Sequence, residues 1–229
     1  LPLCKRVIKD AHRILLGGVR GKEKAPGEYR RGPNWIGPAG CPIEQASFVP
    51  ISADKLSDGM SAWEKFIHAE APDLLVQLAI LHAEFEALHP FMDGNGRIGR
   101  MFVPLFLFKT GLLRYPTFYI SEFFERNRDE YYERLQGVSR GDAWTEWCAF
   151  FLRAVKTQAE GNQAKAAAIL SLYQTKMTWI AELTRSQFAV HTLDFVFRRP
   201  IFESSQFTQQ KEIPIPTAHR ILKLLREKG

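Results

Sequence analysis

The segment that most restricts the fold lies between two apolar helical patterns, at about residues 73–89 and 96–110. It reads His89-Pro90-Phe91-Met92-Asp93-Gly94-Asn95-Gly96-Arg97-Ile98-Gly99-Arg100. Pro90 has no N–H group and ends the first helix at His89, while the glycines on either side of Asn95 permit positive φ. The second helix then starts with unpaired N–H groups, which predict an anion site suited to phosphate.

The side chains of this segment add the groups that phosphate chemistry requires. His89 can accept a proton near neutral pH, and Asp93 offers the hard oxygen ligand that Mg²⁺ prefers. Arg97 and Arg100, three residues apart, share one face of the second helix and can bind phosphate oxygens. Any one of these residues, taken alone, is better explained by structure than by function: as part of a glycine turn, as a surface arginine, or as a hydrogen-bonded histidine at a helix end. Only the ordered set predicts phosphoryl or nucleotidyl transfer.

The remaining patterns predict a mainly α fold. Helices are expected at residues 3–16, 54–69, 73–89, 96–110, within 121–137, and at 143–185. Pro104 should kink the helix that it interrupts. Residues 17–50 hold many glycines and prolines, and within them 34–37 and 46–49 are expected to form the two short strands of a hairpin.

The C-terminal residues predict a separate small unit. A short helix is expected at 191–197, followed by one that starts near Pro216 and turns Ala218, Ile221 and Leu222 inward. This arrangement is similar to the third helix of a winged helix-turn-helix, although the chain stops at Gly229, where the wing would begin. We therefore expect a catalytic domain at 1–160, a connecting helix at 161–189 and a helix-turn-helix-like subdomain at 190–229.

Composition narrows the function classes. Residues 1–31 carry a net charge of +6, residues 32–164 carry −5 and residues 165–229 carry +5, so only the two ends could bind polyanions. Three scattered cysteines without metal-ligand spacing favour a reducing, cytoplasmic setting. No apolar run is long enough for a membrane span, and no signal peptide is recognisable. The chain starts on Leu1-Pro2 rather than on methionine, so we expect residues upstream of it in the natural protein.

The segment 89–100 fills every fixed position of HPFxDGNGRxxR, and the chain thereby resembles the Fic domain family. The likeness extends over about residues 1–160. Flanking stretches resemble other parts of the family's fold. The flap region is matched by Gly27-Glu28-Tyr29-Arg30 and Trp35-Ile36-Gly37, and the motif-entering helix by His82, Phe85 and Glu86. The later helices are matched by Asn127, Tyr131 and Tyr132 and by Gly141-Asp142-Ala143-Trp144. The resemblance implies a Fic-type helical bundle with a small β-hairpin flap. The tail resembles the winged-helix appendage of many bacterial members.

The resemblance implies protein AMPylation, in which AMP passes from ATP to a Ser, Thr or Tyr hydroxyl. By motif match, His89 would be the general base, Phe91 a core anchor, and Asp93 the ligand of Mg²⁺. The residues that would bind the nucleotide are Asp93, Gly94, Asn95, Gly96, Arg97 and Arg100, with Tyr131 and Tyr132 as possible stacking partners of the base. Members that act as kinases have a lysine in place of the second glycine, so Gly96 favours nucleotidyl transfer.

Partners and alternatives remain open at this point. The edge formed by Ser47, Phe48 and Val49 could bind a target peptide by strand addition, which reads little side-chain sequence. Self-modification, a homodimer, a toxin–antitoxin pairing and DNA binding by the tail are all compatible with the sequence. The same site could instead transfer another nucleotide or remove AMP from a target, and the chain could act mainly as a DNA-binding regulator. The family's inhibitory helix, of the form [ST]xxxE[GN], is not found in a suitable place and could lie upstream of Leu1.

Overall fold

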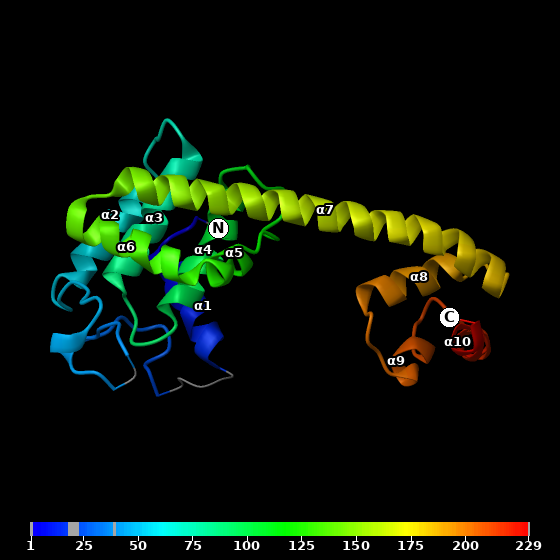
Figure 1. The fold of residues 1–229 in the computed structure, drawn as a ribbon. Coiled ribbons are helices and arrows are strands. Elements are labelled where there is room, and N and C mark those ends of the chain that lie inside the picture. Colours follow the sequence, from blue (N-terminus) through cyan, green and yellow to red (C-terminus); the bar gives the residue numbers. More distant parts are fainter. Residues whose placement is uncertain (1, 18–22, 39, 229) are drawn as a thin grey trace. The chain divides into compact units, whose positions relative to one another are not determined.

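The computed structural model describes residues 2–17, 23–38 and 40–228. Over these residues the fold is mainly helical, as the sequence predicts, and the internal contacts divide it into two units between Glu160 and Gly161 (Figure 1). Among the described residues, no helix combines the length and the hydropathy needed to cross a membrane.

The first unit holds α1 (Lys5–Gly17), a 3₁₀ turn η1 (Ile43–Gln45), α2 (Leu56–Ile67), α3 (Leu74–Leu88), α4 (Asn95–Lys109), α5 (Ser121–Arg126) and α6 (Arg128–Gly141). Helix α7 (Trp144–Thr184) starts in this unit and ends in the second one. The predicted helices are therefore present, with the 121–137 region divided into α5 and α6. Pro104 lies inside α4, which continues past it to Lys109.

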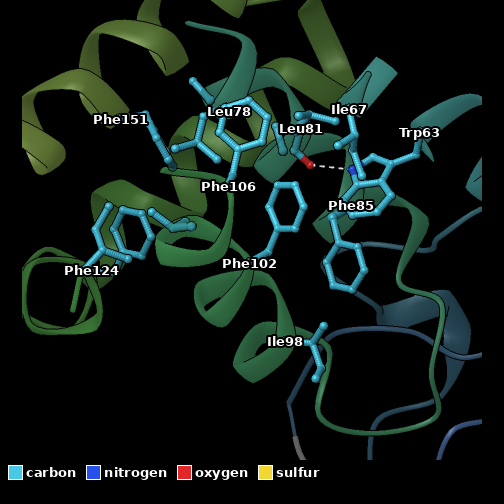
Figure 2. Packing of buried hydrophobic residues seen from close by; sticks show 14 of the residues in the cluster. Trp63, Ile67, Leu78, Leu81, Phe85, Ile98, Phe102, Phe106, Phe124 and Phe151 are labelled. Atoms are coloured by element: carbon cyan, nitrogen blue, oxygen red, sulfur yellow. Dashed lines mark hydrogen bonds between the residues drawn. The ribbon is translucent and has the colours of Figure 1, made fainter. Parts of the chain in front are cut away.

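Helices α3 and α4 form the centre of the first unit because both are apolar along their length. Asp73 caps α3 by accepting hydrogen bonds from the N–H groups of Leu75 and Val76. Buried side chains of α4 pack with buried side chains of α3 and α2 in one apolar cluster (Figure 2). The cluster includes Ile98, Phe102 and Phe106 from α4, Leu78, Leu81 and Phe85 from α3, and Trp63 and Ile67 from α2. The dashed line in Figure 2 is the bond of 2.8 Å from the indole N–H of Trp63 to the carbonyl of Leu81. This packing fixes the two helix ends between which residues 89–94 run.

The predicted hairpin flap is reduced to a single antiparallel bridge between Ile36 and Phe48. The Ile36 N–H donates to the Phe48 carbonyl at 2.9 Å, and the Ile36 carbonyl accepts from the N–H groups of Ser47 and Phe48. The described residues contain no strand. Pro33, Pro38 and the proline at 50 lack the N–H groups that a longer ladder needs, which explains why pairing stops after one bridge.

The second unit contains α8 (Ala189–Arg198), α9 (Ser204–Thr208) and α10 (Ile215–Lys228) with an apolar cluster of its own. That cluster comprises Phe195, Phe207, Ile213, Ala218 and Ile221. Helix α9 was not predicted from the sequence. It has five residues and starts with a reciprocal capping box between Glu203 and Gln206. The α9–turn–α10 order agrees with a helix-turn-helix, but no wing strand occurs in the part of the chain that the structure describes.

Candidate active site

His89 lies at the junction of α3 and the glycine loop, in a backbone conformation that side-chain-bearing residues rarely adopt. Its φ of 45° and ψ of 60° place it in the left-handed region, and its N–H donates to the Phe85 carbonyl as the C-cap of α3. Because the residue before a proline is disfavoured in the right-handed helical region, Pro90 prevents the helix from continuing through His89. The chain therefore turns sharply at the histidine.

The imidazole of His89 is held in its neutral form by burial. The pKa of His89 is lowered from 6.5 to about 4, mainly by the loss of hydration on burial; the Glu86 carbonyl and Asp93 oppose this shift, while the Arg30 cation adds to it. Nδ1 is buried and has no hydrogen-bond partner among the described residues. At neutral pH the ring is thus unprotonated, as a general base must be.

Arg30 holds the turn from the other side. Its side chain is 4% exposed, and its Nε donates to the His89 carbonyl at 2.9 Å while Nη2 donates to the Leu88 carbonyl at 3.3 Å. The backbone N–H of Arg30 donates to the Pro90 carbonyl at 2.9 Å. One residue therefore binds three consecutive carbonyls of the loop.

The next carbonyls are bound by two other residues from the N-terminal part of the chain. The Asn34 amide donates to the Phe91 carbonyl at 3.0 Å. The fully buried His12 accepts the Gly27 N–H on Nδ1, so its Nε2 carries the hydrogen and donates to the Asp93 carbonyl at 2.9 Å. The His12 ring also stacks on Phe91, with centroids 3.8 Å apart. Residues 12–34 thus supply a donor to each of the carbonyls of 88–91 and 93.

Asn95 closes the loop from within. Its side-chain oxygen accepts the Phe91 N–H at 2.8 Å, and its side-chain nitrogen donates to the Phe91 carbonyl at 2.7 Å. With 2% of its surface exposed, this side chain shapes the loop, so only the Asn95 backbone N–H is left for a ligand. Phe91, which these bonds fix, is fully buried, as the predicted core anchor requires.

The start of α4 presents N–H groups outward. Gly94 is the N-cap, with φ of 81° and no side-chain cap, and its own N–H donates to the Asp93 carboxylate at 2.6 Å. The N–H groups of the first helical turn, at Asn95, Gly96 and Arg97, have no acceptor in their own helix. The predicted amide cradle therefore starts at residue 95, and the Gly94 amide serves Asp93 instead.

The charged side chains of the motif gather around this helix start. Arg97 pairs with Asp93 at 3.4 Å, and the two side chains are 39% and 46% exposed. Arg100 lies against Gly96, where an added Cβ would be 3.0 Å from its Nη1. A larger residue at position 96 would therefore displace Arg100. The structure brings Asp93, Gly96, Arg97 and Arg100 together at one helix end.

A buried carboxyl group in this region was not assigned a role from the sequence. Glu86, one turn before His89, is 9% exposed, and its Oε1 has no partner among the described residues. Burial raises the pKa of Glu86 to about 7, and the positive charge of Arg100 opposes that rise. Gly99 permits this arrangement, because a Cβ there would overlap the Glu86 carboxyl. The available sequence signal was an acidic residue one position from Phe85 on a mostly apolar helix.

A cavity of about 330 Å³ opens between the bridge residues, α3 and α6. Its lining includes Ile36, Ser47, Phe48, Glu86, Tyr132 and Ser139. Tyr132 is 42% exposed on this cavity. Tyr131 is 5% exposed, bonds His82 through its hydroxyl at 3.0 Å and stacks on Phe124, so it belongs to the core. Val49 lies outside the cavity lining and is 49% exposed.

The donor set fits a magnesium ion shared with a ligand. Within the described residues, no cluster of three or more histidine, cysteine or acidic side chains could hold a metal alone. Asp93 offers a half-exposed carboxylate at the edge of the amide cradle. Mg²⁺ is commonly held by one or two carboxylates, substrate phosphates and water. Asp93 together with bound phosphates therefore fits this ion.

Comparisons with known proteins agree with the motif. Residues 2–107 match the model of the Fic/DOC family. The chain is 32% identical over 136 residues to a protein adenylyltransferase Fic from Culex quinquefasciatus and 30% identical over 138 residues to one from Aedes aegypti. These matches cover 58% and 59% of this chain but only 24% of each relative, so the chain spans about a quarter of their length.

Solved structures share the fold. A Fic family protein from Desulfovibrio desulfuricans G20 matches 86% of this chain and 59% of its own, with a TM-score of 0.62 at 23% identity. A Fic domain containing signaling protein from Bacteroides thetaiotaomicron VPI-5482 matches 70% of this chain and 64% of its own, with a TM-score of 0.52 at 20% identity.

Proposed function

Because the chain belongs to the Fic/DOC family, we propose that it is a protein adenylyltransferase that moves AMP from ATP to a hydroxyl group of a target protein. The observation that supports the proposal is that Asp93, Arg97 and Arg100 gather at the N–H end of α4, while His89, neutral at pH 7, starts the same loop at the end of α3. The curated relatives bear the name of this activity.

The nucleotide would be held at two places. Its phosphates would accept hydrogen bonds from the amides of residues 95–97 and from Arg97 and Arg100. Binding a phosphate would require Arg97 to leave its ion pair of 3.4 Å with Asp93, which is weak because both groups are well exposed. The base would enter the cavity of about 330 Å³ and meet Tyr132, since Tyr131 is buried in the core.

In the reaction, His89 takes the proton of the target hydroxyl as that oxygen bonds to the α-phosphorus. The bond between the α-phosphorus and the bridging oxygen breaks, and pyrophosphate leaves with the electron pair. Arg97 and Arg100 hold the departing phosphates, so they set the line of attack as well as the affinity. Mg²⁺ on Asp93 would supply charge neutralisation between the phosphates.

The target would dock at the edge next to the bridge. Ser47 is exposed and Phe48 half-buried, and both line the cavity beside α3. A target segment could extend the Ile36–Phe48 pairing through main-chain hydrogen bonds, which selects shape more than side-chain identity. Val49, exposed next to them, would contribute an apolar contact.

Mass spectrometry of the chain after incubation with Mg-ATP tests the proposal, on the chain itself and on added protein extract. We expect the mass of one AMP group on a Ser, Thr or Tyr, and its loss in His89→Ala, since removing a general base costs about 10²–10⁴-fold in rate. His68→Ala is the matched control variant for labelling, because His68 is exposed and lies outside the cavity lining. Equal labelling by His89→Ala would overturn the role of His89.

The same experiment separates the alternatives at this site. Labelled GTP, CTP and UTP test whether another nucleotide is the donor, because the motif binds phosphates rather than the base. Incubation with a protein that already carries AMP tests whether the site removes AMP instead. Release of AMP from that protein, without any labelling by ATP, would favour removal over transfer.

A second candidate function concerns the second unit. The outward face of α10 exposes Arg220, Lys223, Arg226 and Lys228 against the single acid Glu227. We propose that this face contacts the phosphates of duplex DNA. Binding measured by fluorescence anisotropy should weaken steeply as salt rises, and Lys223→Glu should weaken binding and reduce its salt dependence. Absence of binding at low salt would remove this candidate.

A further inference from the structure

We propose that Arg30 is the positioning residue that aims His89 at the reacting hydroxyl and ties that histidine to both ends of the flap. This inference rests on the proposed function, because it assumes that His89 is the base. It adds a residue outside the twelve-residue motif to the machinery of the reaction.

The bonding of Arg30 is unusual for a buried cation. Its side chain is 4% exposed, and the acceptors of its hydrogen bonds are backbone carbonyls, at Leu88, His89, Gly32 and Ile51. Burial lowers the pKa of its guanidinium. A buried charge without a carboxylate partner is costly, and here the carbonyl end of α3 supplies the compensating negative dipole. An apolar side chain at this position could make none of these four hydrogen bonds.

What the guanidinium does is hold a strained turn. A residue other than glycine in the left-handed region, such as His89 with its φ of 45°, is strained and persists only when its surroundings impose that conformation. The Nε of Arg30 binds the carbonyl of His89 itself at 2.9 Å, while Nη2 binds the preceding carbonyl at 3.3 Å. These two bonds define the orientation of the peptide planes on which the imidazole is mounted. Without them His89 can relax, and a displacement of about 1 Å can cost 10²-fold in rate.

The remaining bonds of the same guanidinium reach the flap. Nη1 donates to the Gly32 carbonyl at 3.3 Å, and Nη2 donates to the Ile51 carbonyl. Gly32 precedes the Ile36–Phe48 bridge in the chain and Ile51 follows it. Arg30 therefore links the base to the segments that enter and leave the proposed docking edge. Only the planar fork of arginine can serve carbonyls in so many directions.

The test compares Arg30→Met and Arg30→Lys with the exposed neighbour variant Arg31→Met as the matched control. Each protein is checked by circular dichroism, its affinity for Mg-ATP is measured by calorimetry, and kcat and KM are measured for labelling of a peptide acceptor. We expect Arg30→Met to keep the affinity for ATP within about twofold and to lose about 10²-fold in kcat. Arg30→Lys should recover part of that loss, and Arg31→Met should lose nothing.

A double variant separates positioning from general damage. If Arg30 acts through His89, Arg30→Met should cost nothing further in kcat when placed in His89→Ala. If Arg30→Met does not fold, Arg30→Lys carries the comparison, with a smaller kcat loss expected and ATP affinity unchanged. Wild-type kcat in both variants, equal losses of kcat and ATP affinity, or an undiminished cost in the His89→Ala background would each overturn the inference. Full labelling by His89→Ala alone would instead overturn the role of His89 as the base, and absence of any labelling by the wild-type chain would overturn the proposed function.

Discussion

Replacing His82 by phenylalanine should make the first unit less sensitive to acid. His82 is fully buried among aromatic rings and stacks on Trp147 at 6.0 Å between centroids. Burial lowers its pKa from 6.5 to about 3, with the nearby Arg100 charge contributing in the same direction. Between these two values the unfolded chain binds a proton that the folded chain refuses, so the free energy of unfolding falls as pH falls.

The size of this effect follows from the pKa difference. One pKa unit corresponds to about 1.36 kcal/mol, so lowering pH from 7 to 5 should remove about 2 kcal/mol of stability through His82 alone. Phenylalanine keeps the ring packing and cannot take up the proton. The other histidines with lowered pKa, His12 and His89, are present in both proteins, and their contributions cancel in the comparison.

The free energies of unfolding of the wild type and His82→Phe are measured at each pH by urea unfolding. Tryptophan fluorescence reports on the first unit, because four of the five tryptophans lie within residues 1–160. The variant also leaves the Tyr131 hydroxyl without its partner, which costs about 1–3 kcal/mol at every pH. Tyr131→Phe breaks the same bond and keeps His82, so its pH slope should match the wild type. A stability difference between His82→Phe and wild type that stays flat from pH 7 to 5 would refute the reasoning.

Further predictions concern the loop and its chemistry. Gly99→Ala should lower the free energy of unfolding by about 1–3 kcal/mol in urea, because the added methyl meets the buried Glu86 carboxyl. Phe91→Ala should cost about 3–5 kcal/mol and lower the melting temperature, since the ring is fully buried. With the pKa of His89 lowered to about 4, the rate of labelling should fall only near pH 4; a midpoint near 6.5 would contradict this. Chelation of Mg²⁺ should abolish labelling, and Asp93→Asn should raise the Mg²⁺ concentration needed for half-maximal rate.

The helices of the site were predictable because their signal is local. The apolar side chains of α3 and α4 recur every three or four residues, and Pro90 marks the end of the first helix within one residue of its observed end at Leu88. The motif predicted His89 at the end of one helix, and Asp93 and the arginines at the start of the next. The helices, the proline stop and the motif are each determined by residues close together in the chain, so a single sequence is enough to predict them.

The contacts that hold the loop were not predictable because they join distant residues. His12 and Asp93 are 81 positions apart, and Arg30 and His89 are 59 apart. The only sequence signal for His12 was a polar residue on the apolar face of α1. Which of Tyr131 and Tyr132 would be buried depended on the pairing of α6 with His82. The predicted hairpin was wrong in extent, because prolines on both sides limit the pairing to one bridge.

The donors that residues 12–34 supply to the carbonyls of 88–91 and 93 limit how far this domain can be trimmed or transplanted. A fragment that starts at α2 would contain the whole motif and still lack the groups that keep its turn in shape. Grafting residues 89–100 onto another pair of helices would meet the same difficulty. The smallest portable piece therefore starts at α1.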